Sequence, residues 1–321
     1  MAAAPELHEG SFVDEVWAVG RKHGVQAAGI VGSRQGQEAG VAGRMNLEGR
    51  TAVITGAASG IGRALAISLA SRGCHLALTD VDEVGMRETT DLVASTQERA
   101  PSQSRVRVSQ HRVDVADRDA VANFPSAVTA EHPGVDVLIN NAGVAVGGTF
   151  EQVAEEDFEW LFEINFWGVV RMTRAFLPLL RASGDARIVN ISSLYGLVAP
   201  PEQVPYAASK FAVRGFSEAL RHELEGSGVG VTVVHPGGVN TSIAEKARIP
   251  AGVTEEEIER RRKRYRKLLR MPPAIAAETI VRGIERRQPR VLVGSDAKVT
   301  SLIQRLLPVS YWKVLARRAG D

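Results

Sequence analysis

The chain has 321 residues, 44% of them hydrophobic and 24% charged, a composition that is ordinary for a soluble globular enzyme. Its single cysteine, Cys74, excludes an internal disulfide, and no stretch approaches the roughly 20 apolar residues that a membrane span needs. Because Met1–Gly10 also lack the basic and apolar regions of a secretory signal, we expect a cytoplasmic protein. We expect Cys74 to fill the core at the start of a strand rather than to react.

Residues 1–44 differ from the rest: they are rich in Gly, Ala, Gln and Arg and show no sustained hydrophobic period. We expect a poorly ordered extension, or alternatively a natural start at Met45 preceded by an over-called reading frame. After Met45, β-branched runs alternate with helical patterns, and the expected strands are 51–55, 75–80, 106–115, 135–140, 187–192, 229–235 and 290–294. This alternation predicts one α/β domain over residues 45–295, with a doubly wound parallel seven-stranded sheet of the Rossmann type, in the order 3-2-1-4-5-6-7.

A glycine-rich turn lies between the first expected strand and its helix, and contains Gly56, Ser59, Gly60, Ile61 and Gly62. A pyrophosphate binds at such a place because the unpaired N–H groups and the dipole of a helix N-terminus favour an anion. Gly56 permits the sharp turn, Gly60 the approach of the phosphates, and Gly62 the close packing of helix on strand. The alternative is a tight connection without a ligand, but the strand before it and the helix after it favour dinucleotide binding.

Asp80 ends the second expected strand, 18 residues after Gly62. A carboxylate at this place can accept hydrogen bonds from the adenosine ribose and repels a 2′-phosphate. Ser59 is uncharged and offers such a phosphate no cation. These residues predict NAD (NADH) as the cofactor and disfavour NADP. The alternative for Asp80 is a turn or N-cap position, since Val81 and Asp82 follow.

Tyr206 and Lys210 are four residues apart in a helical pattern that runs to about Glu225. Residues at i and i+4 share a helical face, so the phenol and the ammonium are neighbours. The cation favours the phenolate and brings a pKa that is ordinarily about 10 toward the range useful for acid–base catalysis. By itself such a pair is typical of a surface. However, Ser193 and Asn141 follow other strands, whose carboxyl ends meet at one crevice in a parallel sheet.

From about Leu47 to Gly294 the sequence resembles the short-chain dehydrogenase/reductase family, in its oxidoreductase-type branch. The resemblance rests on the order and spacing of six motifs: Thr55-Gly-x3-Gly-x-Gly, Asn140-Asn141-Ala142-Gly143, Asn165, Ser193, Tyr206-x3-Lys210 and Pro236-Gly237-x3-Thr241. It implies that Tyr206 is the general acid/base, that Lys210 assists it and holds the nicotinamide ribose, and that Ser193 hydrogen-bonds the substrate oxygen. Asn165 would anchor a water that links Lys210 to solvent.

The resemblance also implies which residues surround the cofactor. Asp114 and Val115 would contact the adenine, and the segment 236–241 would pass the nicotinamide. The expected cofactor residues are Gly56, Ser59, Gly60, Ile61, Gly62, Asp80, Asp114, Val115, Asn141, Ala142, Gly143, Tyr206, Lys210, Pro236, Gly237, Val239 and Thr241. No metal ligands are expected. A homodimer or homotetramer would form through the helices that carry Asn165 and Tyr206.

Two apolar loops, 144–150 and 194–201, belong to the same expected edge of the sheet. They favour a bulky hydrophobic alcohol or ketone such as a sterol, a retinoid or a long-chain aliphatic compound, unless they merely pack beneath the rim. The resemblance also implies a substrate lid over about residues 242–272, in which Thr254 and Glu257 form a capping box. Residues 296–321 form an amphipathic basic extension that bends at Pro308.

The C-terminal part of the chain is strongly basic, since residues 241–321 hold 19 Lys and Arg against 9 Asp and Glu. One interpretation is a solvated lid and a tail that packs on the body or on a partner subunit. The other places both against an anionic membrane surface, from which a lipidic substrate is drawn. Nucleic-acid binding is not expected, because the basic run lacks interleaved aromatic residues.

The sequence therefore predicts an NAD(H)-dependent oxidoreductase that interconverts an alcohol and a carbonyl by hydride transfer. The alternative is a non-catalytic dinucleotide-binding sensor or scaffold with the same fold. The intact set of Ser193, Tyr206 and Lys210 favours the enzyme.

Overall fold

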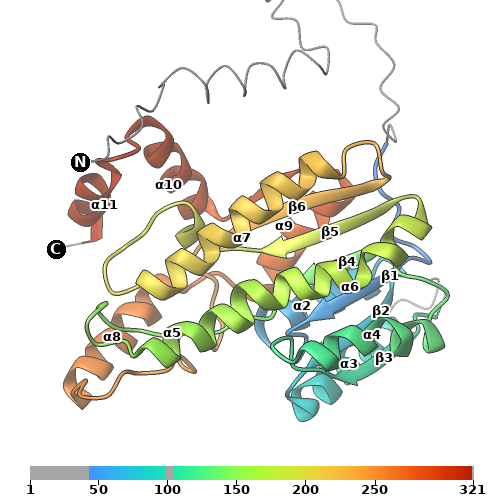
Figure 1. The fold of residues 1–321 in the computed structure, drawn as a ribbon, viewed down its shortest axis with the longest axis horizontal. Helices are drawn as coiled ribbons and strands as arrows, with labels where there is room; N and C mark the ends of the chain where they lie inside the picture. Colours follow the sequence, from blue (N-terminus) through green and yellow to red (C-terminus); the bar gives the residue numbers. More distant parts are fainter. Residues whose placement is uncertain (1–42, 99–104, 320–321) are drawn as a thin grey trace, which may run out of the picture. The chain divides into compact units, whose positions relative to one another are not determined.

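A computed structural model describes residues 43–98 and 105–319. Nearly all of the expected N-terminal extension, 1–44, lies outside the described residues. The described chain forms a seven-stranded parallel sheet in the order β3-β2-β1-β4-β5-β6-β7, which confirms the predicted fold and strand order (Figure 1). The strands are β1 (Thr51–Thr55), β2 (His75–Asp80), β3 (Val108–Arg112), β4 (Val137–Asn140), β5 (Ala186–Ile191), β6 (Val229–Pro236) and β7 (Arg290–Val293).

β3 is shorter than the sequence predicts. Its ladder with β2 ends at the pair Asp80 and Arg112, because β2 itself ends there. The chain then turns, and the N–H of Asp117 donates to the carbonyl of Asp114 at 3.0 Å. The side-chain carboxylate of Asp114 also accepts from the N–H of Ala116 at 2.9 Å. The predicted strand 106–115 therefore includes a turn that leads into the next helix.

Helices cover both faces of the sheet. One face carries α2 (Gly60–Ala70), α3 (Glu83–Glu98) and α9 (Pro273–Glu285), and the other α4 (Arg118–Glu131), α6 (Gly168–Ser183) and α7 (Val204–Glu223). The remaining elements are α5 (Glu155–Phe162), the π-helical turn η1 (Glu163–Trp167), the 3-10 turn η2 (Leu194–Gly196), α8 (Glu255–Leu268), α10 (Ser295–Leu306) and α11 (Tyr311–Ala319). The expected bend at Pro308 is a break between α10 and α11. In Figure 1, α8, α10 and α11 lie on the side toward which the strand arrows point.

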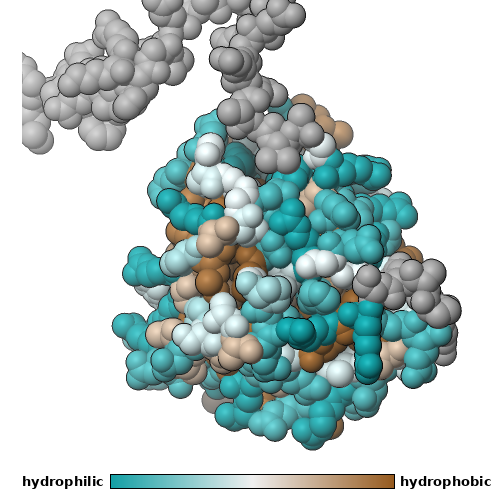
Figure 2. Space-filling model, turned by 90° about the vertical axis from the view of Figure 1, so that its right-hand side faces the viewer, coloured by the Kyte–Doolittle hydropathy of each residue, from teal (hydrophilic) through white to brown (hydrophobic). Residues whose placement is uncertain are grey.

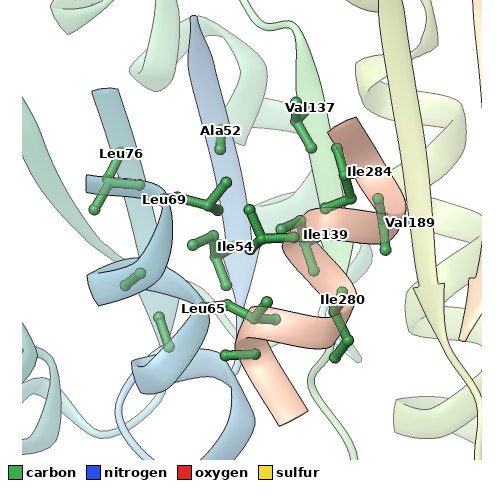
Figure 3. Packing of buried hydrophobic residues seen from close by; sticks show 14 of the residues in the cluster. Ala52, Ile54, Leu65, Leu69, Leu76, Val137, Ile139, Val189, Ile280 and Ile284 are labelled. Carbon is green, nitrogen blue, oxygen red and sulfur yellow. The ribbon is translucent and has the colours of Figure 1, made fainter. Parts of the chain in front are cut away.

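The packing of α2 and α9 on the sheet fixes the start of α2. Figure 3 shows Leu65 and Leu69 of α2 and Ile280 of α9 packed over Ile54 and Ile139 of the strands. All five side chains are fully buried. Burying such a side chain stabilises a fold by about 1.5–3 kcal/mol. This contact holds the N-terminus of α2, which carries the glycine turn, against the ends of β1 and β4.

Charged residues close the opposite edge of the sheet, where the strands begin. Arg50 contacts Asp136 at 2.8 Å and Asp185 at 3.1 Å, and Arg287 contacts Asp185 at 2.6 Å. Figure 2, which shows the molecule from the right-hand side of Figure 1, is mostly hydrophilic, with apolar residues in small separate areas.

Cys74 lies directly before β2 and is fully buried, as expected for a residue of the core. Burial raises the pKa of its thiol, which disfavours the reactive thiolate. None of the helices in the described part of the chain is long and apolar enough to cross a membrane.

Candidate active site

The glycine turn has the backbone that a bound phosphate needs. Gly56 and Gly60 have φ angles of +66° and +54°, a left-handed conformation that side chains disfavour. A Cβ atom on Gly62 would lie 2.0 Å from the carbonyl oxygen of Gly56. Each glycine is therefore required where the sequence places it, and the helix starts tightly against the strand.

The Asn-Asn-Ala-Gly motif at the end of β4 holds this turn in place. The side-chain amide of Asn141 donates to the carbonyls of Thr55 (3.0 Å) and Gly56 (3.1 Å). The N–H groups of Asn141 and Ala142 both donate to the hydroxyl of Thr55 at 2.9 Å. A Cβ on Gly143 would lie 3.4 Å from Nζ of Lys210, so the same motif also reaches the predicted catalytic residues.

The start of α2 fits the pyrophosphate of a dinucleotide. Ser59 precedes the helix in an extended conformation and makes no side-chain cap, so the first-turn N–H groups of α2 are open to an anion. A pocket at this end is lined by Ser59, Gly60, Arg63, Asn240 and Thr241, among other residues. The side chain of Thr241 packs within 3.1 Å of the position that a Cβ on Gly60 would take. None of the predicted catalytic residues lines this pocket. It lies at the start of α2, where the pyrophosphate is expected to bind.

Asp80 stabilises the turn through two backbone hydrogen bonds and keeps acceptor positions for a ligand. Its carboxylate accepts from the N–H groups of Ala58 (3.0 Å) and Asp82 (3.1 Å), as the turn interpretation requires. A carboxylate has about four acceptor positions, so two remain for ribose hydroxyls. The nearby Arg63 donates to the carbonyl of Ala58 and forms an ion pair with Glu88 at 2.7 Å. Its charge is therefore already partnered.

The other expected cofactor residues lie around the same edge of the sheet. Asp114 is exposed, whereas the side chain of Val115 is buried against Gly168 and belongs to the core. Val239 is buried and pairs with Met271 after α8. Pro236 ends β6, and a Cβ on Gly237 would lie 2.2 Å from the carboxylate of Asp296. The structure thus brings these residues to one edge, and their contacts with a cofactor stay predictions.

Lys210 has a buried ammonium at the centre of the site. The residue is 4% exposed, and Nζ donates to the carbonyl of Ile191, the last residue of β5, at 3.2 Å. Nζ lies 5.6 Å from the ring centre of Tyr206, one helical turn away on α7. Burial lowers the pKa of Lys210 to about 8, because loss of water penalises the charged form. The ring of Tyr195 meets that of Tyr206 edge-on at 6.1 Å.

Two adjacent serines at the end of β5 have different roles. The hydroxyl of Ser192 is buried and donates to the carbonyl of Lys210 at 2.9 Å, so it ties the strand end to α7. The hydroxyl oxygen of Ser193 accepts from the N–H of Tyr195 at 3.0 Å. That contact leaves the Ser193 proton available for another acceptor. The structure therefore supports Ser193, and not Ser192, as the group that faces a substrate oxygen.

His235, which the sequence analysis did not single out, holds the backbone of Ser193. Its Nδ1 lies 2.9 Å from the Ser193 carbonyl, so Nδ1 carries the proton and donates. Burial lowers the pKa of His235 to about 4, although the bond to Ser193 opposes the change. Nε2 has no protein partner within the described residues, so a second proton there would be buried unpaired. The sequence could not indicate this contact, because a single histidine inside an apolar strand does not reveal which backbone group it will bond.

Asn165 connects α7 to the loop after β4. It lies fully buried in η1, and π-helical turns of this kind are frequent at functional sites. Its side chain accepts from the N–H of Val144 (2.8 Å) and donates to the Val144 carbonyl (3.0 Å) and to Ser209 (3.2 Å). Ser209 in turn donates to the carbonyl of Tyr206 at 2.8 Å. Asn165 thus positions the segment that carries Tyr206, and its role toward a water stays a prediction.

The expected lid segment is fastened by two arginines that the sequence analysis did not identify. Arg248 lies 3.5 Å over the ring of Trp160 and bonds Asp157 at 2.7 Å. Arg261 on α8 contacts Glu257 at 2.5 Å and Glu202 at 3.7 Å. Arg261 and Glu257 are one helical turn apart on α8. The contacts of Arg248 with Asp157 and Trp160, and of Arg261 with Glu202, join residues far apart in the chain, so no local motif indicates them.

The structure tests the predicted start of α8 and the two apolar loops. The N–H of Glu257 donates to the hydroxyl of Thr254 at 3.3 Å, which is one of the two bonds of the predicted capping box, whereas the Glu257 carboxylate pairs with Arg261. Val146, Leu197 and Val198 are buried, so the middle of each apolar loop packs beneath the rim, whereas Phe150 is exposed.

In the described part of the chain, no three metal-binding side chains come together.

Comparisons with known proteins agree with this geometry. The profile of the family described as short chain dehydrogenase matches residues 50–251. A Mycobacterium tuberculosis protein named as an oxidoreductase, SadH, is 43% identical over 273 residues, which cover 84% of this chain and 95% of that protein. A short chain dehydrogenase/reductase from Burkholderia phymatum, solved in complex with NAD, is similar with a TM-score of 0.73 and 31% identity over 82% of this chain and 95% of that one. A metagenomic short-chain oxidoreductase in complex with NADP has a TM-score of 0.54 and 33% identity over 60% and 84%.

The buried, neutral His235 predicts a loss of stability in acid. Its pKa of about 4 in the folded protein is below the ordinary value of 6.5, so between these values the unfolded chain binds a proton that the folded chain does not. The free energy of unfolding therefore falls as the pH falls through this range, by up to about 1.4 kcal/mol per pH unit for this group. The variant His235→Asn, whose amide can still donate to Ser193, should show a shallower fall in urea unfolding. His132, whose pKa burial also lowers to about 4, is common to both proteins. Parallel slopes would contradict the assignment.

Proposed function

The chain belongs to the short chain dehydrogenase family, and on that premise we propose that it interconverts an alcohol and a carbonyl by dinucleotide-dependent hydride transfer. One observation carries the proposal: the buried ammonium of Lys210 lies one helical turn from Tyr206, beside the strand end that presents Ser193. A buried lysine is rare because its charge loses water. A sensor or scaffold with this fold has no need of that charge beside a phenol.

The chain's own residues divide the acid–base work between them. The nicotinamide supplies the carbon that accepts or returns the hydride. In alcohol oxidation the Tyr206 oxygen takes the proton of the substrate hydroxyl, and in carbonyl reduction it gives that proton back. The hydroxyl of Ser193 donates to the substrate oxygen and stabilises the negative charge that develops there. The ammonium of Lys210 stabilises the phenolate form of Tyr206 and has donors that suit ribose hydroxyls.

We propose NAD(H) rather than NADP(H) as the cofactor. The support is the Asp80 carboxylate at the end of β2, which would meet a 2′-phosphate as a like charge, while the nearby Arg63 is already paired with Glu88. The similar Burkholderia structure is a complex with NAD, and the similar metagenomic structure a complex with NADP.

We propose a hydrophobic alcohol or ketone, such as a sterol, a retinoid or a long-chain aliphatic compound, as the substrate. The support is the apolar residues of the loops 144–150 and 194–201 that are not buried beneath the rim: Val144 and Leu194 are partly exposed, and Phe150 is 68% exposed. We also propose that the protein works in the cytoplasm, which suits a single, buried cysteine.

Tyr206→Phe should reduce turnover by about 100-fold or more, because it removes the proton-exchanging group. It should leave NADH binding almost unchanged. Turnover is followed by the absorbance of reduced nicotinamide against short, sterol-like and long-chain alcohols, and binding by NADH fluorescence. Tyr195→Phe is the matched control, since it removes the neighbouring phenol, and it should retain most of the activity. Unchanged turnover in Tyr206→Phe would refute the assigned role.

Asp80→Asn should raise the ratio of kcat/KM for NADP to that for NAD by about tenfold or more, because it removes a charge that repels the 2′-phosphate. The asparagine oxygen can still accept from the N–H of Ala58, so the turn should persist. Asp82→Asn, which keeps an acceptor for the N–H of Gly85 at the start of α3, is the control and should leave the ratio unchanged. An equal ratio in wild type and Asp80→Asn would contradict NAD selectivity at this residue.

We propose a homodimer or homotetramer that forms through the helices carrying Asn165 and Tyr206. Trp167, Val204 and Phe211 on these helices are 45%, 42% and 37% exposed, and large exposed apolar side chains mark contact surfaces. Sedimentation equilibrium should give a mass of two or four chains, and Trp167→Ala with Phe211→Ala should shift it toward one chain. A monomeric wild type would contradict this proposal.

A further inference from the structure

The C-terminal helices are anchored to two loops of the site. The carboxylate of Asp296, at the start of α10, accepts from the N–H of Gly238 at 2.7 Å, in the turn expected to pass the nicotinamide. The hydroxyl of Tyr311, at the start of α11, accepts from the N–H of Ala199 at 3.1 Å, in the apolar loop between Ser193 and Tyr206. The pair of helices is therefore fixed beside the expected entrance of the substrate.

The outer face of α10 exposes large apolar side chains. Val299, Leu302 and Leu306 are 45%, 58% and 69% exposed, and their spacing puts them on one side of the helix. Ala297 and Thr300, on the opposite side, are buried against the body. Leu307 and Val309, in the turn that follows, are 39% and 93% exposed and extend the same apolar surface. We call Val299, Leu302, Leu306, Leu307 and Val309 the α10 surface.

Basic residues border the α10 surface. Lys298 and Arg305 are exposed on α10 next to the apolar stripe, and Lys313 is exposed on α11. Residues 298–319 contain five Lys and Arg and no Asp or Glu. If two copies of this surface paired symmetrically, like charges would face each other. An anionic partner with an apolar interior suits both the charge and the exposed leucines.

We propose that the α10 surface docks on the anionic surface of a lipid bilayer, with its apolar side chains inserted at the level of the headgroups. The helix would lie in the interface rather than cross it. The anchors at Gly238 and Ala199 would then hold the substrate loop close to the membrane. The catalytic benefit of this docking rests on the proposed function, because a hydrophobic substrate would then pass from the bilayer to Ser193 and Tyr206 without crossing water.

The test is flotation of the full chain with phosphatidylcholine vesicles that contain or lack phosphatidylglycerol. The wild type should float with the anionic vesicles, and less so in high salt. Leu302→Ser with Leu306→Ser should lower the bound fraction by about tenfold. Lys298→Gln with Arg305→Gln should lower it as well. The matched control is Val84→Ser with Leu92→Ser, two exposed apolar residues of α3 (58% and 44% exposed), which should float like the wild type.

Equal flotation of the wild type and the Leu302→Ser, Leu306→Ser variant would overturn the proposal. So would binding that does not depend on phosphatidylglycerol, or a change of oligomeric state in that variant during size-exclusion chromatography, which would show that a second copy covers the surface.

Oxidation of a short, water-soluble alcohol without vesicles separates this inference from the proposed function. The leucine variant should keep this activity, because the α10 surface is not part of the catalytic set. If flotation fails while the activity is intact, the docking inference alone is wrong. The opposite result is also informative. If the leucine variant binds the anionic vesicles less than the wild type, as expected, but neither the wild type nor the variant turns over any alcohol or ketone, the proposed function alone is wrong.

Discussion

The parallel direction of all seven strands is the constraint on which the site depends. Because each strand must return through a helix, every segment that follows a strand starts at the same edge of the sheet. Asp80, Asn141, Ser193 and Pro236 follow or end four different strands and so come to one place. The packing of α2 and α9 on β1 and β4 then sets how closely the glycine turn approaches this edge. The same apolar contacts that stabilise the domain therefore position the expected cofactor site.

The buried ammonium of Lys210 is the costly part of this arrangement. An unpaired buried charge would destabilise the fold, and the carbonyl of Ile191 provides one compensating acceptor. The absence of a side chain at Gly143 leaves room beside Nζ, and Asn165 and Ser209 connect the first turns of α7 to the loop after β4. Backbone carbonyls and a buried amide thus place a cation beside Tyr206 without a carboxylate, which would otherwise neutralise it.

The substrate side is built by contacts of another kind. The expected lid segment is held by Arg248 on Trp160 and by Arg261 at Glu202, and the C-terminal helices by Asp296 and Tyr311. Arg261, Asp296 and Tyr311 lie outside the segment 50–251 that matches the family profile. The chemistry is therefore expected from the motifs within the family profile, whereas the expected entrance depends largely on segments that follow it in the chain. This division explains why the reaction class follows from the motifs, while the substrate has to be argued from the shape and polarity of the loops.

The sequence by itself determined the sheet order, the glycine turn and the set of Asn165, Ser193, Tyr206 and Lys210. The glycine turn and the pair of Tyr206 and Lys210 follow from local patterns, whereas Asn165 and Ser193 follow from the order and spacing of motifs that resemble a known family. Tertiary structure alone decided that β3 ends where β2 ends and that His235 holds Ser193. It also decided that Arg248 stacks on Trp160 and that Tyr311 reaches Ala199. Each of these contacts joins residues from separate parts of the chain, and its energy arises only when packing brings the two side chains together.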